Sequence, residues 1–296
     1  MDVAEAVRVS VEMPDERYEH LWDSIVVDQS LKERLLRAVA VTLRLRGCLP
    51  FEATALHGLA LLHGPPGTGK TTLARGLAHE LAELTTGRRT RLIEVNPHGL
   101  MSAEHGQSQR RVIQLLTEHL PQLADDGIPT VVVLDEVESM AVARSEASLA
   151  ANPADVHRAT DAVLSALDTN TVTMPNLTFV ATSNFTGVLD EAFLSRVDVA
   201  IHVPPPDAKG VLAILTVTLE SMAEAFPQLR QLAKDPDLTR VAEHLAGTDG
   251  RRVRKTVTEA MVGRLETVVD PGQLTVEDLL AAATQLRGNG RLGGAQ

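Results

Sequence analysis

Eight residues, Gly64 to Thr71, constrain the fold of this chain more than any other feature of its sequence. They read Gly-Pro-Pro-Gly-Thr-Gly-Lys-Thr and fit the pattern G-x-x-x-x-G-K-[ST], in which glycines let backbone N–H groups turn inward around phosphate oxygens. The apolar run 58–64 predicts a buried strand before them, and the apolar spacing over 71–84 predicts a helix after them. A glycine turn with a surface lysine is the alternative, but the order of strand, loop and helix favours a phosphate-binding loop.

Two side chains of this loop have predicted chemical roles. Lys70 supplies a positive charge for β- and γ-phosphates, and Thr71 offers a hydroxyl to Mg²⁺. The helix that starts near Thr71 points the positive end of its dipole toward the same anion. The predicted nucleotide-binding residues of the loop are Gly64, Pro65, Pro66, Gly67, Thr68, Gly69, Lys70 and Thr71.

Strand-like and helix-like segments alternate up to residue 203, and every later candidate segment is helix-like. The alternation implies right-handed crossovers and a mainly parallel sheet with helices on both faces. The predicted fold class is therefore α/β, a parallel sheet flanked by helices, followed by a small all-α domain. The predicted strands span 58–64, 91–96, 130–136, 177–184 and 197–203, and the predicted helices between them span 71–84, 109–120, 155–168 and 190–196.

Four segments are expected along the chain. Apolar residues at every fourth position indicate a helical N-terminal lead-in over 1–52. The large α/β nucleotide-binding domain spans 53–205, and the prolines at 204–206 mark its end. A small all-α lid domain spans 206–286, and the glycine-rich tail 287–296 is expected to be disordered.

Two adjacent carboxylates follow the most apolar predicted strand. Asp135 and Glu136 would lie at the carboxyl end of that strand, where open α/β sheets place their ligands. Asp135 would hold Mg²⁺ through a water molecule, and Glu136 would polarise the attacking water. Such a pair favours hydrolysis over phosphoryl transfer to a small acceptor. Glu138 is expected to be structural or solvated.

Three polar residues further along the chain are candidates for completing the site. Asn184 ends the strand after the Asp-Glu strand and could hold the attacking water, although an Asn at a strand end is also a common turn residue. Arg196 lies at the end of the short predicted helix 190–196 and could reach the γ-phosphate of a neighbouring subunit. Arg251 opens a basic helix and could reach back to the phosphates. The alternative for each arginine is a surface salt bridge.

The order of four motifs in the chain resembles the AAA+ ATPases. The motifs are Gly-Pro-Pro-Gly-Thr-Gly-Lys-Thr, Leu-Asp-Glu-Val-Glu-Ser, Thr-Ser-Asn and Ser-Arg-Val-Asp. Within these ATPases, the chain is similar to the pachytene-checkpoint family (thyroid-receptor-interacting-protein type) over roughly residues 20–285. The finer match lies in residues 21–28, 62–64, 134–139, Arg158 with 162–164, and 250–251 with 254–255.

This resemblance implies that the chain hydrolyses ATP as a homo-hexamer with nucleotide sites at subunit interfaces. It implies that Asn184 is sensor 1, Arg196 the trans-acting finger and Arg251 sensor 2. It also implies that backbone near Val26 lines the adenine pocket and that Leu73 contacts the nucleotide. Members of the family remodel HORMA-domain proteins. Short bacterial relatives separate a HORMA protein from a cyclic-oligonucleotide synthase in anti-phage signalling, which makes such a protein the expected client.

The chain departs from the family in two respects. Eukaryotic members carry a substrate-recruiting domain before the ATPase core, whereas here the matching stretch starts near residue 20, as in the short bacterial type. The pore-loop segment 102–108 lacks the aromatic residue that grips substrate, and no aromatic lies between Phe51 and Phe179. His105 is the candidate replacement, with a solvated loop histidine as the alternative, so brief pulling is a safer expectation than processive threading.

Composition limits the competing functions. The chain has 28 Lys and Arg against 39 Asp and Glu, a net charge of −11, which gives it no overall attraction to nucleic-acid phosphates. A DNA-directed AAA+ ATPase of the clamp-loader or initiator type remains an alternative, supported by the basic run 251–255. A nucleotide-gated scaffold with little turnover is another. Cys48 is the only cysteine, and no signal peptide or apolar span is apparent, so a cytoplasmic location without membrane contact is expected.

Overall fold

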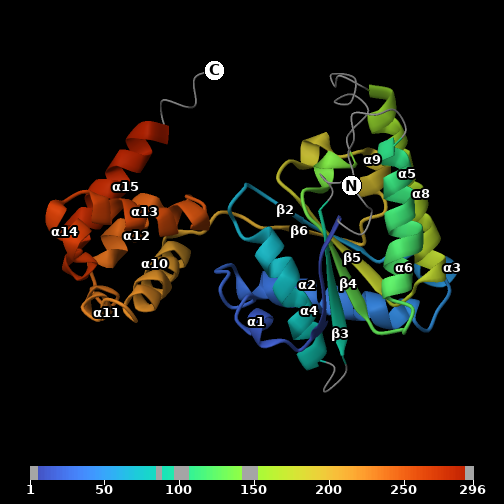
Figure 1. Cartoon of the computed structure of the whole chain (residues 1–296), viewed down its shortest axis with the longest axis horizontal. Coiled ribbons are helices and arrows are strands. Elements are labelled where there is room, and N and C mark those ends of the chain that lie inside the picture. The colour runs from blue at the N-terminus through green and yellow to red at the C-terminus, as the bar shows by residue number, and fades with distance from the viewer. Residues whose placement is uncertain (1–5, 85–88, 97–106, 142–152, 291–296) are drawn as a thin grey trace. The chain divides into compact units, whose positions relative to one another are not determined.

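The computed structural model of the chain (Figure 1) describes residues 6–84, 89–96, 107–141 and 153–290. Contacts divide the chain into two compact units. Unit 1 comprises Met1–Gly64 and Lys70–Val203, and unit 2 comprises Pro65–Gly69 and Pro204–Gln296. The middle of the phosphate-binding loop therefore groups with the C-terminal helices, while both of its ends belong to the sheet-containing unit.

Unit 1 contains a six-stranded sheet with the order β1-β3-β4-β5-β2-β6 (Figure 1). Neighbouring strands are parallel, except that β1 runs antiparallel to β3. The prediction of a mainly parallel sheet flanked by helices is confirmed. The strands are β1 (Val7–Met13), β2 (Leu59–His63), β3 (Thr90–Val95), β4 (Thr130–Leu134), β5 (Leu177–Ser183) and β6 (Val199–His202).

The central strands are buried on both faces, which explains their nearly continuous apolar sequences. In β4, Val132 and Leu134 pack in one hydrophobic cluster, whereas Val131 and Val133 pack in the other, because successive side chains of a strand point to opposite faces. One face is covered by α2 (Gln29–Arg46) and α4 (Lys70–Leu84), and the other by α5 (Gln107–Ile113), the π-helix η3 (Gln114–His119), α6 (Leu120–Leu123) and α8 (Pro153–Thr173). Shorter elements are α1 (Glu16–Glu19), α3 (Phe51–Thr54), η4 (Val137–Ser139), η5 (Thr186–Val188) and α9 (Glu191–Leu194).

The structure corrects the expectation of a helical lead-in over residues 1–52. Helix α2 lies within it, but Val7–Met13 form strand β1 at the edge of the sheet. Residues 7–13 read VRVSVEM, and their apolar members are partly or fully buried while the polar ones are exposed. This alternation has the period of a half-buried strand. The sequence therefore contains a strand signal, which was missed because the four-residue apolar spacing further along the lead-in indicated a helix.

Every described element of unit 2 is helical. One expectation needs correction: residues 287–290, placed in a disordered tail, continue helix α15. The elements are α10 (Ala208–Met222), α11 (Leu229–Leu232), α12 (Leu238–Leu245), α13 (Gly250–Val262), α14 (Leu265–Val269), η6 (Pro271–Gln273) and α15 (Val276–Gly290). Across both units, no helix among the described residues has the length and apolarity needed to cross a membrane.

Candidate functional site

Three predicted site residues of unit 1 lie where three parallel strands end. Lys70 begins α4 after the phosphate-binding loop that follows β2, Glu136 follows β4, and Asn184 follows β5. Strand β2 pairs in parallel with β5, and β4 pairs in parallel with β5 on its other side. Their carboxyl ends therefore meet at one edge of the sheet, which is where open α/β sheets bind ligands.

Lys70 is buried at this edge and is held by two oxygen atoms. Its Nζ donates to the carbonyl of Gly64 at 2.8 Å and to Oδ1 of Asn184 at 2.8 Å. Burial lowers the pKa of the Lys70 ammonium, and nearby carboxylates, above all that of Glu138, oppose that shift. The loop lysine and the strand-end asparagine, which are 114 residues apart in sequence, thus lie in direct contact.

Thr71 and Asp135 form a cluster of oxygen atoms beside Lys70. The Thr71 hydroxyl donates to Oδ1 of Asp135 at 2.5 Å, and the Thr182 hydroxyl donates to the same oxygen at 2.6 Å. Hydroxyl and carboxylate oxygens are ligands that Mg²⁺ prefers, and this ion commonly takes only one or two of them from the protein. The pair Thr71 and Asp135 therefore fits the predicted magnesium site.

Glu136 has an unusual backbone conformation. Its φ of 52° and ψ of 56° lie in the left-handed region, which costs a residue with a side chain about 1–3 kcal/mol and is found at functional sites. The Thr182 hydroxyl accepts a hydrogen bond from the backbone N–H of Glu136 at 3.0 Å. Thr182 thus fixes both members of the carboxylate pair, and sequence reasoning assigned it no part in the site.

Asn184 connects the loop lysine with the second carboxylate. While Oδ1 of Asn184 accepts from Lys70, its Nδ2 donates to Oε1 of Glu136 at 3.3 Å. The Glu136 side chain is exposed at the edge of the sheet. An amide between an ammonium and an exposed carboxylate can orient a water molecule there, because it has both a donor and an acceptor.

Glu138 belongs to this cluster, although the sequence favoured a structural or solvated residue. Its Oε1 accepts the backbone N–H of Asn184 at 3.0 Å, and its buried Oε2 has no hydrogen-bond partner among the described residues. Glu138 therefore fixes the position of Asn184. The one sequence signal for it was its position two residues after Glu136.

Arg251 lies beside the middle of the phosphate-binding loop, within unit 2. A cavity of about 360 Å³ is lined by Pro66, Gly67 and Asp249 together with Arg251. Gly67 has a φ of 79°, and a Cβ on it would lie 2.2 Å from Oδ1 of Asp249, so only glycine fits. Asp249 in turn caps α13 by accepting the backbone N–H of Arg252 at 3.0 Å.

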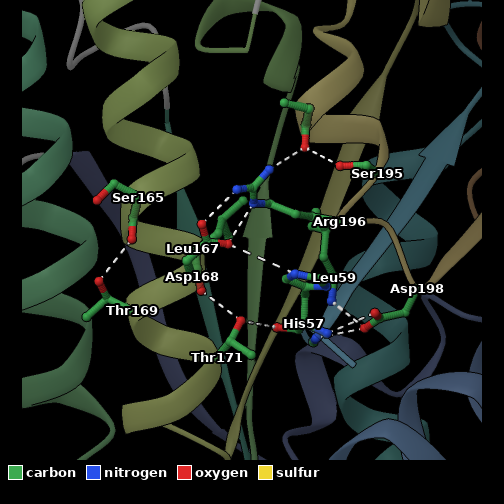
Figure 2. A network of polar contacts seen from close by, with 12 residues as sticks. His57, Leu59, Ser165, Leu167, Asp168, Thr169, Thr171, Ser195, Arg196 and Asp198 are labelled. Atoms are coloured by element: carbon green, nitrogen blue, oxygen red, sulfur yellow. Dashed lines mark hydrogen bonds and ion pairs between the residues drawn. The ribbon is translucent and has the colours of Figure 1, made fainter. Parts of the chain in front are cut away.

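Arg196 lies in a different network (Figure 2). Its guanidinium contacts both carboxylate oxygens of Asp168, on α8, and the carbonyl of Ala192. Among the described residues, none of these hydrogen bonds is with the residues at the strand ends. The structure thus brings together Lys70, Thr71, Asp135, Glu136 and Asn184 and places Arg196 apart from them.

The two residues expected near the nucleotide base have different surroundings. The Leu73 side chain is fully buried in the cluster beneath α2 and α4, and Val26 is partly exposed in a segment that follows Trp22. Trp22, at the start of that segment, approaches α4 closely, since a Cβ on Gly76 would lie 2.7 Å from the Trp22 nitrogen. Lys32, on α2, donates to the Trp22 carbonyl at 2.6 Å.

The predicted pore-loop residue His105 and its neighbours at 102–106 lie outside the described residues. The remaining two positions of that segment, 107 and 108, begin α5.

Comparison with known proteins agrees with this geometry. Residues 60–205 match the AAA family, described as "ATPase family associated with various cellular activities". The chain is 44% identical over 287 residues to CD-NTase-associated protein 6 of Pseudomonas aeruginosa, covering 97% of this chain and 94% of that protein. It is 32% identical to the pachytene checkpoint protein 2 homolog of Danio rerio, covering 89% of this chain and 68% of that protein.

Solved structures share the fold. The structure described as C. elegans PCH-2 superposes with a TM-score of 0.71 at 23% identity, covering 94% of this chain and 75% of that one. A chain of the E. coli MS115-1 HORMA:CdnC:Trip13 complex superposes with a TM-score of 0.74 at 14% identity, covering 96% and 97%. From the site geometry and the two sequence relatives together, the chain belongs to the AAA ATPase family, in the group that includes CD-NTase-associated protein 6 and the pachytene checkpoint protein 2 homologues.

Proposed function

We propose that this chain hydrolyses ATP in a ring hexamer and uses the cycle to remodel a HORMA-domain protein. The observation that carries the proposal is the position of Asn184, whose side-chain amide contacts both Lys70 and Glu136. That arrangement lets one residue sense the phosphate end of ATP and the group that activates water.

Each strand-end residue has one chemical task. Lys70 binds the β- and γ-phosphates, and Thr71 and Asp135 hold Mg²⁺, which neutralises charge that develops on the phosphates. The exposed carboxylate of Glu136 accepts a proton from the attacking water. Asn184 orients that water, and its own position is kept by Glu138. No covalent intermediate is required, because positioning and electrostatics carry phosphoryl transfer.

The variant Glu136→Gln tests the catalytic half of the proposal. It keeps the size and hydrogen-bonding reach of the side chain but removes the base, so steady-state ATP turnover should fall by about 10²–10⁴-fold. ATP binding, measured by calorimetry or with a fluorescent analogue, should be retained. Glu243→Gln, the same change on the exposed surface of α12, is the matched control. Wild-type turnover in Glu136→Gln would reject the role of Glu136.

The client half of the proposal draws support from the relatives. The name of the Pseudomonas aeruginosa relative associates it with a CD-NTase, and a protein of the same fold has been solved in a HORMA:CdnC:Trip13 complex. Glu136→Gln protein loaded with ATP should therefore retain a HORMA-domain protein, alone or with a cyclic-oligonucleotide synthase, in a pull-down read by mass spectrometry. Retention that is equal with and without ATP would contradict an ATP-driven remodeller.

A further inference from the structure

Arg196 is held at three of its nitrogen atoms by groups of its own chain (Figure 2). Its Nε donates to Oδ1 of Asp168 at 2.6 Å and its Nη2 donates to Oδ2 at 2.7 Å. Its Nη1 donates to the carbonyl of Ala192 at 2.6 Å. The Asp168 contact is the bidentate arrangement in which arginine and carboxylate fit best, and Arg196 holds the pKa of the Asp168 carboxyl below its usual range.

These contacts leave two N–H donors of the Arg196 guanidinium available for a further hydrogen-bond acceptor. An arginine has five N–H donors, and the three contacts use one each on Nε, Nη1 and Nη2. One N–H therefore remains on each terminal nitrogen, with no partner among the described residues. Two N–H groups on adjacent nitrogens match the spacing of two phosphate oxygens. Arg196 can thus bind an anion without releasing Asp168.

The loop that carries Arg196 is also fastened two residues further on. The Asp198 carboxylate accepts the backbone N–H groups of His57, Gly58 and Leu59 at 2.9, 2.7 and 3.0 Å. Figure 2 shows Asp198 at these N–H groups and Arg196 at Asp168 on α8. The loop is therefore tied to α8 at one end and to the start of β2 at the other.

Asp168 in turn has a fixed place on α8. The neighbouring Leu167 side chain is buried, and the Leu167 carbonyl accepts the Thr171 hydroxyl at 2.8 Å. The same hydroxyl reaches the His57 carbonyl at 3.2 Å, and the His57 ring lies 4.0 Å from Asp168 Oδ1. The carboxylate that holds Arg196 is therefore anchored to the sheet unit rather than presented on a mobile side chain.

We propose that Asp168 is the positioning residue for Arg196, holding its guanidinium so that the two remaining N–H groups are presented to the nucleotide of a neighbouring subunit. This inference rests on the proposed function, because it needs Arg196 to act in trans. Free arginine side chains have many rotamers, and a charged group fixed before the reaction needs no reorganisation during it. The ion pair with Asp168 fixes the Arg196 guanidinium in this way.

The test is steady-state ATP turnover by Asp168→Asn. The variant loses the carboxylate charge and one of two matched acceptors, so turnover should fall by up to roughly 10²-fold, which is the scale of a misplaced group. This loss is smaller than the roughly 10³-fold expected when a finger is removed. Asp168→Glu keeps the charge and should recover part of the loss. Glu191→Gln, an equal charge change on the exposed side of α9, is the matched control. Unchanged or higher turnover in Asp168→Asn would overturn the inference, and higher turnover would indicate that Asp168 restrains the finger.

Two further measurements separate this role from a fold defect and from failure of the proposed function. Asp168→Asn subunits mixed with Glu136→Gln subunits should regain turnover, because the second variant supplies an ordered Arg196 to intact sites of the first. No recovery at any mixing ratio would indicate damage to the site of Asp168→Asn itself and would also overturn the inference. Arg196→Ala alone tests whether Arg196 acts as a finger. Normal ATP turnover by this variant would show that the proposed function is wrong. Reduced turnover in Arg196→Ala together with normal turnover in Asp168→Asn would reject only the positioning role of Asp168.

Discussion

Single residues at the strand ends are held by short, specific hydrogen bonds. Thr182 fixes Asp135 through its hydroxyl and Glu136 through the backbone, and Glu138 fixes Asn184. Sequence reasoning predicted residues for phosphate and water contacts that the structure brings together at the strand ends, because their types and spacing follow from that chemistry. It missed their supports, because a threonine or a glutamate that only orients a neighbour follows no such pattern.

The support role of Glu138 can be tested directly. Glu138→Ala removes the acceptor for the Asn184 backbone N–H, so Asn184 should shift from its contacts with Lys70 and Glu136, and ATP turnover should fall about tenfold. Glu138→Gln keeps an acceptor oxygen and should lose clearly less activity. Turnover measured at saturating ATP checks both variants. Equal losses in the two would show that the charge of Glu138, and not its hydrogen bond to Asn184, is what matters.

At the scale of elements, the five parallel strands were predicted, whereas the antiparallel edge strand β1 was missed. β2, β3, β4 and β5 are short apolar runs flanked by turn residues or helices, and β6 follows a short helix. β1 differs because it is half-exposed and amphipathic, and its partner β3 lies far away in sequence. The alternation over residues 7–13 is a local strand signal, but only the distant partner β3 shows that the segment joins this sheet, whereas a buried strand is visible within five or six residues.

An ion pair between a half-buried arginine and a buried carboxylate joins α4 to the sheet. Arg75, on α4, donates to both carboxylate oxygens of Glu94, on β3, at 2.8 and 2.6 Å, and the Glu94 side chain is 2% exposed. Arg75→Met should lower the free energy of unfolding by about 3–5 kcal/mol, because it leaves a buried carboxylate without its partner.

Chemical denaturation of Arg75→Met checks this expectation. The double variant Arg75→Met with Glu94→Leu is the control. It also removes the unpaired carboxylate and should therefore be clearly more stable than the single variant. A single variant as stable as the wild type would mean that solvent reaches Glu94 and that the pair contributes little.

For the whole molecule, the separation of Arg196 from the strand-end residues has a direct implication. Within one chain, Arg196 contacts Asp168 and Ala192, whereas Lys70 and Glu136 share Asn184. If Arg196 is the finger proposed above, it would act on the nucleotide of another copy, and each ATP would be contacted by two subunits.

Shared sites make a prediction about mixed assemblies. Arg196→Ala subunits should bind ATP but hydrolyse it roughly 10³-fold more slowly. Mixed with Glu136→Gln subunits, which are inactive but carry an intact arginine, they should regain part of the turnover. A titration of one variant into the other, followed by phosphate release, measures this recovery. If the mixtures gained no turnover at any ratio of the two variants, every site would be completed by its own chain.

The place of β1 in the sheet also affects the order in which the protein can fold during synthesis. Met13 of β1 pairs with Thr90 of β3, so the N-terminal strand emerges from the ribosome long before its partner does. Domains fold from the N-terminus as they are made, but here the first strand has to wait until the phosphate-binding loop and α4 have been translated. This edge of the sheet is thus completed only after β2 and α4, which precede β3 in the chain, have been made.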